Sequence, residues 1–570
     1  MRIAVITHYT YGNNYGQRLQ NIALVQYLKN IYKTDDIYTF VYAMGYKKRL
    51  VPVKNSALES KFLKPISINL DDTKTFTGFD LYVIGSDQVF NLDNKWMGSH
   101  VKDFLCGRTL VKCGEKHFIT YAASDCLKLG QYKKFVSKYF KYISFREKES
   151  ISYNKIENST YNIDPVFLWD IDFWTNIEKK PEFINDNEVF DFCYMRSKSK
   201  NDESHFTTNK DGTRTYHLYF NNPIQSNKIG YGEFLWLVHH CRKITTCSFH
   251  GFSFSIIFQK KDIEFENNYR IMNLIDILHV KYNGGIIENF DEIQKYIKYE
   301  QERALNYFKN SCVFNYACYS KDKGIHDKST SGGVCAELAR YAIDNNYIVY
   351  GGSYNEDFTK VIIKPVDNMD DYFRYLSKSK YNFSFLPKFR DIKEKLENGI
   401  NILYIGSPCQ IYMLKKYLNK DYNNLLLVDF KCRGFSKPQR LKEFVQYIKD
   451  KYHRAIKDID FRYNHTVNGI RVTLDNNIVL NYNVEYFNSF VFKNRLDRCE
   501  NCIYGHGLKS YSDITVSDFW LNSKNKVHIG QDFTPQKGCN HVRTNTLKGF
   551  LFFNEIRNKL NIKKLFNGFQ

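Results

Sequence analysis

The 570-residue sequence has only ten prolines and no tract rich in proline, glycine or serine. Such tracts form flexible tethers between domains, so we expect the folded units to adjoin through a short helical connection. No run approaches the 18 consecutive apolar residues of a transmembrane helix. The apolar stretch at residues 3–7 is also far shorter than a signal-peptide core. We therefore expect a cytoplasmic protein.

Structural disulfides are not expected, because the cytoplasm is reducing. The chain has 14 cysteines, and eight of them lie at or beyond Cys312. In a reducing compartment a cluster of cysteines points to metal or redox chemistry. That chemistry is therefore expected in the second half of the chain.

Acidic residues are fewer than basic ones: the chain has 61 Asp and Glu and 82 Lys and Arg, which gives a net charge of +21. A basic excess can serve nucleic acid, anionic lipid or phosphorylated ligands. The basic residues are scattered, however, and no DNA- or RNA-recognition motif accompanies them. We expect no nucleic-acid partner, and a charge that helps docking to acidic ligands or to a membrane face. A zinc-stapled nucleic-acid-binding protein is the least favoured interpretation.

The length exceeds what one hydrophobic core supports, so several folded units are expected. Hydrophobic residues make up 43% of the chain, which is ample for packed cores and argues against long disordered stretches. We predict an α/β protein with one domain at residues 1–295 and another at residues 310–570.

Polar residues follow several predicted strands of the first half. The apolar residues 3–7 form a strand that leads through a glycine-bearing loop, residues 12–16, into a helix. Residues 81–84 and 243–247 are further strands, followed by Asp87 and His250. Open α/β sheets bind ligands at the carboxyl ends of their strands. The glycine loop suits a phosphate or carboxylate at a helix N-terminus, although such loops also serve only to turn the chain.

Six segments of the first half resemble, in order, the polysaccharide pyruvyl transferase family. They are residues 14–24, 83–91, 121–124, 143–149, 163–165 and 248–251. The resemblance implies a GT-B-like pair of Rossmann-type lobes facing a cleft. It also implies transfer of a pyruvyl group from phosphoenolpyruvate to two hydroxyls of a sugar, which forms a ketal.

The implied reaction requires particular side chains. Phosphoenolpyruvate carries a phosphate and a carboxylate, which planar cations bind well, and Arg18 and Arg146 are the candidates. Protonating the enol carbon needs a group that titrates near neutrality, for which we predict His250. Asp87 would orient the acceptor sugar or act as a base. By motif match, further substrate contacts are expected from Tyr15, Gly16, Gly85, Ser86 and Ser248.

Each of these residues has a purely structural alternative. His250 could be a hydrogen-bonded structural histidine, Arg146 could form only surface ion pairs, and Asp87 could be a helix N-cap. The stretch between Pro165 and Gly232 is short and polar, so we also expect a second lobe that is reduced relative to the family.

The second half contains two cysteines at the ends of predicted strands. Residues 401–405 and 425–430 form the strands, which are followed by Cys409 and Cys432, and a C-x-x-C pair, Cys499 and Cys502, lies far downstream. Four thiolates in this pattern could hold zinc or an iron–sulfur cluster, and spacing alone does not separate the two. The structural alternative is that Cys409 and Cys432 are small buried hydrophobic residues.

Eight segments of the second half resemble the coenzyme F-420 hydrogenase/dehydrogenase beta subunit family. They are residues 329–334, 349–352, 377–381, 406–410, 428–434, 461–462, 499–502 and 512–520. The resemblance implies an α+β domain that binds FAD and a 4Fe–4S cluster. The cluster ligands would be Cys409, Cys432, Cys499 and Cys502, and the flavin would contact Ser331, Gly332, Gly333 and Lys380.

Two departures from this family affect the prediction. Only Cys312 and Cys318 precede the Ser-Gly-Gly motif, where family members often carry ferredoxin-type cysteine runs, so electrons would come from a separate protein such as ferredoxin. Arg433 also stands where the family tends to have histidine. We therefore predict a bifunctional surface-polysaccharide enzyme that combines pyruvyl transfer with flavin- and iron–sulfur-dependent oxidoreduction. The alternative is a redox enzyme whose first half only binds a glycan or a partner.

Overall fold

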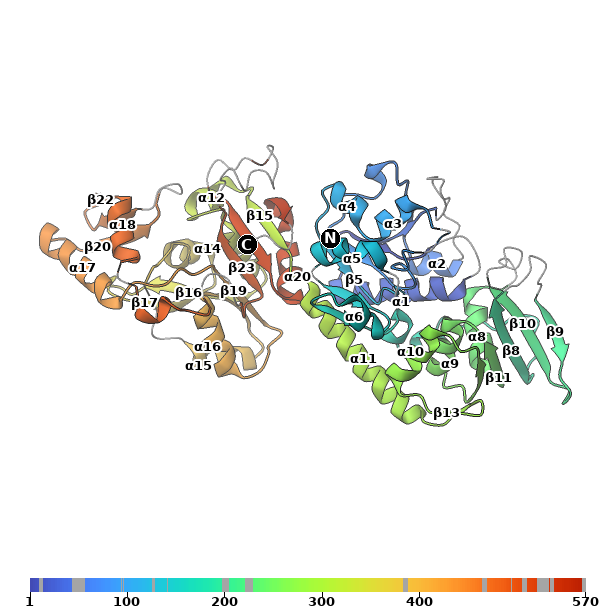
Figure 1. Ribbon diagram of the computed structural model, residues 1–570. Coiled ribbons are helices and arrows are strands. Elements are labelled where there is room, and N and C mark those ends of the chain that lie inside the picture. Colours follow the sequence, from blue (N-terminus) through green and yellow to red (C-terminus); the bar gives the residue numbers. More distant parts are fainter. Residues whose placement is uncertain are drawn as a thin grey trace. The chain divides into compact units, whose positions relative to one another are not determined.

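A computed structural model divides the chain into two compact units, Met1–Phe308 and Lys309–Gln570 (Figure 1). The described residues are all those outside 10–13, 44–56, 94, 96, 126–128, 141, 197–203, 221–228, 383–387, 464–468, 494, 505–509, 520–532, 534–537 and 566–570. The ends of the two predicted domains, residues 295 and 310, both fall within one helix, α11 (Phe290–Ser311).

The first lobe of the N-terminal unit is built on a five-stranded parallel sheet in the order β3-β2-β1-β4-β5. Its strands are β1 (Ile3–Ile6), β2 (Ile37–Val41), β3 (Pro65–Ser67), β4 (Leu81–Ile84) and β5 (Phe118–Thr120). Every residue of β1 and β4 is buried, as expected of central parallel strands that are covered on both faces. A two-stranded parallel sheet, β6 (Ile143–Phe145) with β7 (Ser159–Tyr161), extends this lobe.

Several helices accompany these strands. They are α1 (Tyr15–Tyr32), α2 (Ala57–Phe62), α3 (Ser99–Leu105), α4 (Arg108–Lys112), α5 (Lys133–Tyr139) and α6 (Glu149–Asn154). The Asn14 side chain caps α1 by accepting a hydrogen bond from the Gln17 amide.

The second lobe has a seven-stranded sheet in the order β13-β14-β12-β11-β8-β10-β9, and its strands β12, β11, β8 and β10 run parallel. The strands are β8 (Phe190–Arg196), β9 (His205–Thr208), β10 (Arg214–Phe220), β11 (Lys243–Thr246), β12 (Asp262–Phe265), β13 (Tyr282–Asn283) and β14 (Ile286–Ile287). The helices are α7 (Ile171–Thr175), α8 (Tyr231–His240), α9 (Phe249–Ile257) and α10 (Tyr269–Leu278). The polar stretch that suggested a reduced lobe thus contributes β8, β9 and β10 to a full sheet.

The two lobes share one apolar cluster and one helix. Tyr15, Leu19 and Ala23 of α1 belong to the same buried cluster as the strands and helices of the second lobe. Helix α11 returns to the first lobe, where Phe308 stacks on Tyr121 at 4.9 Å between ring centroids. The predicted fold class is confirmed: this unit is a GT-B-like pair of Rossmann-type lobes.

The C-terminal unit is an α+β domain around an eight-stranded mixed sheet, in the order β17-β16-β18-β19-β23-β24-β15-β25. Its parallel centre consists of β16 (Tyr347–Tyr354), β18 (Asn401–Gly406), β19 (Leu425–Asp429) and β23 (Ile514–Asp518). The antiparallel strands are β15 (Asn315–Ser320), β17 (Val361–Val366), β24 (Asn540–Thr544) and β25 (Leu560–Leu565).

Helices of this unit include α13 (Val334–Asp344) after the Ser-Gly-Gly motif and α16 (Pro408–Leu418) after β18. The others are α12 (Lys323–Lys328), α14 (Met369–Asp371), α15 (Phe389–Glu397), α17 (Pro438–Tyr452), α18 (Val484–Val491) and α20 (Leu547–Glu555). A separate core joins α17 and α18 to the antiparallel sheet of β20 (Ile456–Phe461), β21 (Ile470–Leu474) and β22 (Val479–Tyr482).

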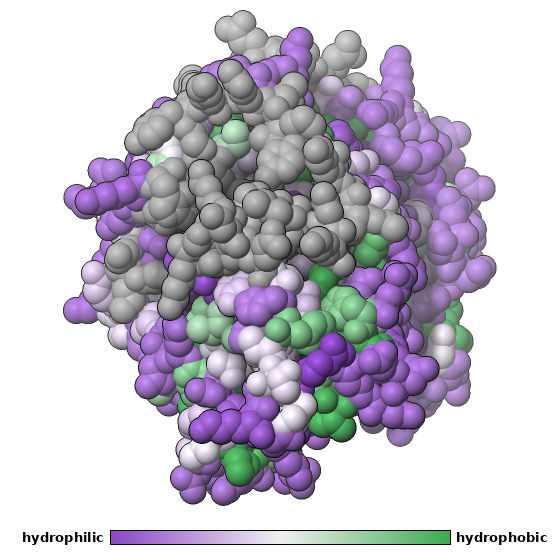
Figure 2. Space-filling model, turned by 90° about the vertical axis from the view of Figure 1, so that its right-hand side faces the viewer, coloured by the Kyte–Doolittle hydropathy of each residue, from purple (hydrophilic) through white to green (hydrophobic). Residues whose placement is uncertain are grey.

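Among the described residues, no helix has the length and hydrophobicity needed to cross a bilayer. Among the residues drawn in colour in Figure 2, most are hydrophilic, and several hydrophobic ones gather in the lower central part of the view.

Candidate functional site

The carboxyl ends of the first-lobe strands bring charged side chains together. His8 lies two residues after β1, Asp87 three residues after β4, and Arg146 directly after β6. Asp164 lies three residues after β7, at the N-cap of a short 3-10 helix, Pro165–Leu168. All four residues are almost completely buried, with at most 5% of each surface exposed. The parallel strands therefore place two carboxylates, a guanidinium and an imidazole in one region of the lobe.

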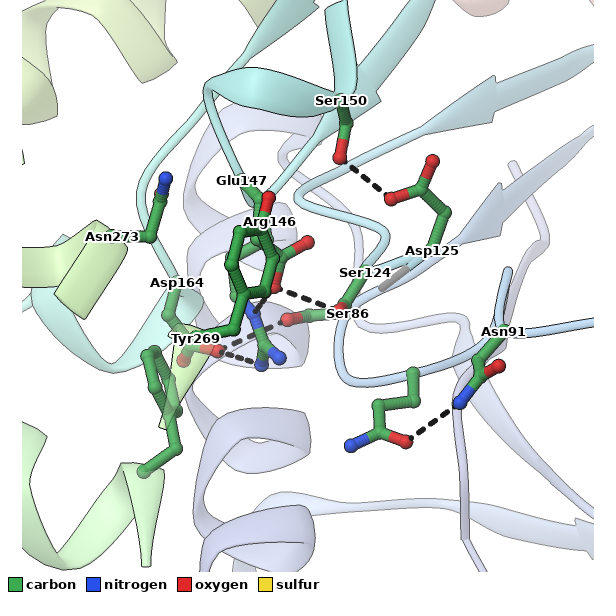
Figure 3. A network of polar contacts seen from close by, with 12 residues as sticks. Ser86, Asn91, Ser124, Asp125, Arg146, Glu147, Ser150, Asp164, Tyr269 and Asn273 are labelled. Atoms are coloured by element: carbon green, nitrogen blue, oxygen red, sulfur yellow. Dashed lines mark hydrogen bonds and ion pairs between the residues drawn. The ribbon is translucent and has the colours of Figure 1, made fainter. Parts of the chain in front are cut away.

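Asp164 is at the centre of these side chains, and we call His8, Asp87, Arg146 and Asp164 together the Asp164 group. Asp164 Oδ2 accepts hydrogen bonds from Ser86 Oγ at 3.2 Å and Arg146 Nη1 at 3.1 Å (Figure 3). The same oxygen lies 3.5 Å from His250 Nε2. Its Oδ1 accepts from the Val166 amide at 3.2 Å. Burial alone would raise the pKa of Asp164, but His250 and Arg146 outweigh burial and lower the pKa to about 2. Asp164 is therefore an anion that joins groups from both lobes.

His250 comes from the second lobe, in the first turn of α9. Ser248 caps this helix, because its Oγ accepts a hydrogen bond from the Gly251 amide at 3.3 Å. The imidazole lies directly against Gly16 of α1: a Cβ atom at Gly16 would come within 2.1 Å of His250 Nδ1. Only glycine permits this approach, so Gly16 in the first turn of α1 makes room for the histidine of the second lobe.

Asp87, also in the Asp164 group, has a left-handed backbone conformation, with φ of 57°. Its Oδ2 accepts a hydrogen bond from Gln17 Nε2 at 2.8 Å. Burial would raise the pKa of Asp87, but the neighbouring His8, Arg146, His250 and Arg270 hold the pKa below its usual value. No helix begins at Asp87, so the N-cap alternative does not describe it.

Arg146 is held by two carboxylates rather than at the surface. Its Nε donates to Glu147 Oε1 at 3.1 Å, and its guanidinium lies 4.3 Å from the Phe249 ring centroid. Glu147 also accepts from Ser124 Oγ at 2.7 Å, as Figure 3 shows. Burial raises the pKa of Glu147 above its usual value. Arg146 therefore orders the buried carboxylates, and the surface ion-pair alternative does not describe it.

The remaining residues predicted to bind substrate have structural partners. Tyr15 is 2% exposed, its hydroxyl donates to the Ile229 carbonyl at 2.9 Å, and its ring stacks on Phe234. Arg18 lies 3.4 Å over the Tyr9 ring and 3.5 Å from Glu59. For Tyr15 and Arg18, contact with substrate stays a prediction.

Gly85 has a backbone conformation that favours glycine. Its φ is +137°, and a Cβ atom there would come within 2.0 Å of the Tyr121 carbonyl oxygen. Gly85 thus brings the strand end close to its neighbour, and its contact with substrate also stays a prediction.

Four residues of the site lay outside the set predicted to act. Asp164 belonged to a recognised motif without a role, whereas His8, Gln17 and Arg270 belonged to no argument about chemistry. His8 could have been found from its place at the end of a buried strand. The positions of Gln17 and Arg270 depend on tertiary contacts that sequence spacing does not reveal.

The four predicted cluster cysteines come from three parts of the C-terminal unit. Cys409 lies in the first turn of α16 after β18, and Cys432 lies three residues after the neighbouring strand β19. Cys499 ends a 3-10 helix, Asp497–Cys499, and Cys502 follows in the same segment. A Cβ atom at Gly434, whose φ is +102°, would come within 3.1 Å of Cys499 Cβ. Gly434 thus lets the loop after β19 approach the C-x-x-C segment.

Burial and mutual repulsion make the predicted ligand thiols difficult to ionise. Burial raises the pKa of Cys432 to about 12, and Cys409, Cys499 and Cys502 add to the effect. Burial also raises the pKa of Cys409, with contributions from Cys502 and Cys499. Several neighbouring thiols are difficult to ionise because the thiolates would repel one another. A bound cation favours the thiolate form instead. The donor set therefore fits a metal centre.

The Ser-Gly-Gly loop before α13 is closely packed by the protein itself. A Cβ atom at Gly332 would come within 2.7 Å of the Asn540 amide nitrogen, and Ser331 Oγ donates to the Cys539 carbonyl at 3.1 Å. Asn540 Oδ1 also accepts from the Val334 amide at 3.2 Å. These contacts explain why the loop needs small residues. The flavin-binding role of Ser331, Gly332 and Gly333 stays a prediction.

Lys380 lies near Lys378, Asp458 and Asp460, and its Nζ donates to the Lys378 carbonyl at 2.8 Å. Burial and the Lys378 charge lower the pKa of Lys380 to about 7. At neutral pH this side chain carries only part of its charge, so it is a weaker cation than the sequence suggested.

Comparisons with known proteins divide the chain in the same way. Residues 14–261 match the family model for polysaccharide pyruvyl transferase. Residues 400–565 match the model for the C terminus of the coenzyme F420 hydrogenase/dehydrogenase beta subunit. No curated protein matches the chain.

Two solved structures share a limited likeness. One is the F420-reducing NiFe hydrogenase complex from Methanosarcina barkeri, at 17% identity over 44% of this chain and 81% of that chain, with a TM-score of 0.32. The other is the UDP-GlcNAc 2-epimerase of Methanocaldococcus jannaschii, at 11% identity over 53% of this chain and 93% of that chain, with a TM-score of 0.27. Both scores are too low to carry a functional argument.

The predicted fusion is confirmed by the two family models. The chain joins an N-terminal segment of the polysaccharide pyruvyl transferase type to a C-terminal segment related to the beta subunit of coenzyme F420 hydrogenases and dehydrogenases.

Proposed function

We propose that residues 1–308 transfer a pyruvyl group from phosphoenolpyruvate to a sugar, and that residues 309–570 carry out flavin- and iron–sulfur-dependent oxidoreduction. The observation that carries the first proposal is the contact of His250, from the second lobe, with the Asp164 group of the first. Asp87, Arg146, Asp164 and His250 come from both lobes, and all four lie within the segment that matches the transferase family.

The proposed transfer consists of an addition followed by a displacement. A sugar hydroxyl oxygen adds to C2 of phosphoenolpyruvate while the methylene carbon gains a proton. A second hydroxyl of the sugar then displaces inorganic phosphate from C2, which completes the ketal and releases its own proton. The reaction therefore needs one group that delivers a proton to carbon and another that accepts protons from the hydroxyls.

His250 and Asp87 suit these two tasks. Asp164 Oδ2 accepts hydrogen bonds from Ser86 and Arg146 and lies 3.5 Å from His250 Nε2, while Oδ1 accepts from the Val166 amide. Asp164 therefore orients the His250 imidazole, which delivers the proton to carbon. The neighbouring cations keep the Asp87 carboxylate ionised and Gln17 fixes its position. We assign Asp87 to accept a hydrogen bond from a sugar hydroxyl and to take its proton as the hydroxyl oxygen attacks.

The transfer is tested by incubating the full-length protein with phosphoenolpyruvate and a panel of lipid-linked and nucleotide sugars. We expect phosphate release that depends on the sugar and is abolished by His250→Gln. His205→Gln on the exposed strand β9 is the matched control and should retain full turnover. Absence of sugar-dependent phosphate release across the panel would contradict the proposal.

The second proposal rests on the four converging thiols. A tetrahedral zinc, with Zn–S bonds of about 2.3 Å, holds its sulfurs about 3.8 Å apart. Among the described residues, no three of these thiols lie mutually within 4.8 Å, a spacing wider than one zinc ion requires. The match of residues 400–565 to the hydrogenase beta subunit family supports a 4Fe–4S cluster on Cys409, Cys432, Cys499 and Cys502. The cluster would supply one-electron transfer when bound.

We further propose that FAD binds beside the Ser331–Gly333 loop and Lys380, and that a separate protein such as ferredoxin supplies electrons. Oxygen-free purification followed by iron and flavin analysis tests the cofactors. Cys499→Ser should lose most of its iron, whereas Cys335→Ser, in α13 outside the set, should retain it. A colourless protein that contains neither iron nor flavin would contradict this half of the proposal.

The rival function has one observation in its favour. Arg146 is occupied by Glu147 and Asp164, so the first half could bind a glycan or a partner without transferring a pyruvyl group. His250→Ala distinguishes the two functions. If the unchanged protein shows no turnover and the variant binds sugar equally well, the binding module is favoured.

A further inference from the structure

A second cluster of ligand atoms lies in the second lobe, outside the Asp164 group. Glu178 follows α7, and His239 and His240 are the last two residues of α8. One ligand atom from each of these residues lies within 4.8 Å of the other two. His239 Nδ1 is 2.7 Å from Glu178 Oε1, and His240 Nε2 is 3.3 Å from Glu178 Oε2. Each carboxylate oxygen therefore faces one imidazole.

Neighbouring aromatic rings hold both imidazoles in place. The His239 ring stacks on Phe258 at 4.5 Å between centroids, and the His240 ring stacks on Trp236 at the same distance. The Glu178 side chain is 8% exposed, whereas those of His239 and His240 are 28% and 44% exposed. Aromatic packing thus fixes the two imidazole rings, while the cluster remains accessible to an ion from solvent.

Simple ion pairing explains only part of this arrangement. One imidazole would satisfy a buried carboxylate, yet two adjacent rings point at the same group. Lys260 Nζ already donates to the main-chain carbonyls of His239 and Cys241, so the end of α8 has its own cation. Two imidazole nitrogens and one carboxylate are the ligand set of a His₂Glu zinc site, which leaves a fourth position for water.

We propose that Glu178, His239 and His240 bind a zinc ion or a similar late first-row divalent cation. With bonds of about 2.0–2.1 Å, a tetrahedral ion holds its ligand atoms about 3.3 Å apart, so the side chains need to move little. Imidazole ligands favour such metals over Ca²⁺ and Mg²⁺, which prefer oxygen. The ion would join the segment after α7 to the end of α8.

Titration of the full-length, chelator-treated protein with Zn²⁺ tests the site. Compared with the unchanged chain, Glu178→Gln and His239→Gln should each bind one fewer zinc per chain. Because the cysteines are the same in all three proteins, the difference isolates this cluster. Glu233→Gln on the same helix, whose carboxylate pairs with Lys179 instead of histidine, should bind as much zinc as the unchanged chain.

Co²⁺ gives a second measurement that does not depend on a variant folding. A site made of nitrogen and oxygen ligands gives visible ligand-field bands without the near-ultraviolet charge-transfer band of a thiolate. We expect one equivalent of such Co²⁺ in the unchanged chain. Equal zinc binding by the unchanged chain and Glu178→Gln, or cobalt bands that come only from thiolate sites, would overturn the proposal.

Discussion

Gly16 is where the two lobes approach most closely at the site. Because a Cβ atom there would come within 2.1 Å of the His250 ring, we expect Gly16→Ala to displace the imidazole from Asp164. A displacement of this size should lower sugar-dependent phosphate release by at least ~10²-fold while the chain still folds. Steady-state kinetics and circular dichroism measure the two effects.

The control for this substitution is Gly230→Ala. A Cβ atom at Gly230 would meet only the carboxylate end of the flexible Glu233 side chain, which can move away. Turnover by this variant should stay near that of the unchanged protein. If Gly16→Ala turned over as fast as Gly230→Ala, the packing of His250 on Gly16 would have no catalytic importance.

Lys380 gives the C-terminal unit a distinct pH dependence. Its pKa is about 7 in the folded protein and near 10.5 in the unfolded chain. The unfolded chain therefore binds more protons between these values, so the free energy of unfolding should rise with pH from about 7 to about 10.5. The side chain is half-buried, and screening limits the effect to about 2 kcal/mol.

Denaturant unfolding across this pH range tests the effect of Lys380. We expect Lys380→Met to flatten the dependence and to stabilise the unit near pH 7, where the cost of burying the lysine is largest. Lys364→Met on the neighbouring strand β17 should keep the slope of the unchanged protein. Parallel slopes for Lys380→Met and the unchanged protein would contradict the lowered pKa.

At the scale of single residues, sequence reasoning located the site better than it explained it. His250 and Asp87 were predicted from polar positions after strands and Arg146 as a cation for phosphoenolpyruvate, and the structure brings all three together. The central role of Asp164 was missed, because its partners come from β4, β6 and the second lobe. Which side chains meet across two lobes is decided by tertiary packing, and no spacing along the chain reports it.

The start of α9 is the element that presents His250. Ser248 Oγ satisfies the Gly251 amide, so Ser248→Ala should destabilise the N-terminal unit by about 1 kcal/mol. Ser248→Asn can still cap the helix and should recover most of that loss. Thermal unfolding measures the stability, and the Michaelis constant for the sugar shows whether Ser248 also contacts substrate. Equal stability of the Ala and Asn variants would contradict the capping role.

At the scale of elements, buried strands were predictable and polar strands were not. Strands such as β1 and β4 can be predicted from their uniformly apolar sequences, because both faces of a central parallel strand are covered. Strand β9 has exposed and half-buried residues and lies at the edge of its sheet, so its sequence resembles a loop. Cys409 and Cys432 were placed correctly because neighbouring parallel strands end at the same edge.

At the scale of the whole molecule, the two compact units should unfold separately. Ile244→Ala in β11 removes a fully buried side chain and should cost about 2–5 kcal/mol. We expect it to lower the transition of the N-terminal unit and to leave that of the C-terminal unit unchanged. Ile402→Ala in β18, which is equally buried, should have the opposite effect. Calorimetry that shows both transitions moving together would contradict two independent units.

The apolar cluster around α1 also limits how this chain could be recombined with its relatives. One face of α1 carries Tyr15, Leu19 and Ala23 into the core of the second lobe. The same helix supplies Gly16 and Gln17 to the residues around Asp87 and His250. A chimaera that replaced the second lobe would therefore also need an α1 face that fits the new lobe, or the histidine at the start of its α9 would be misplaced.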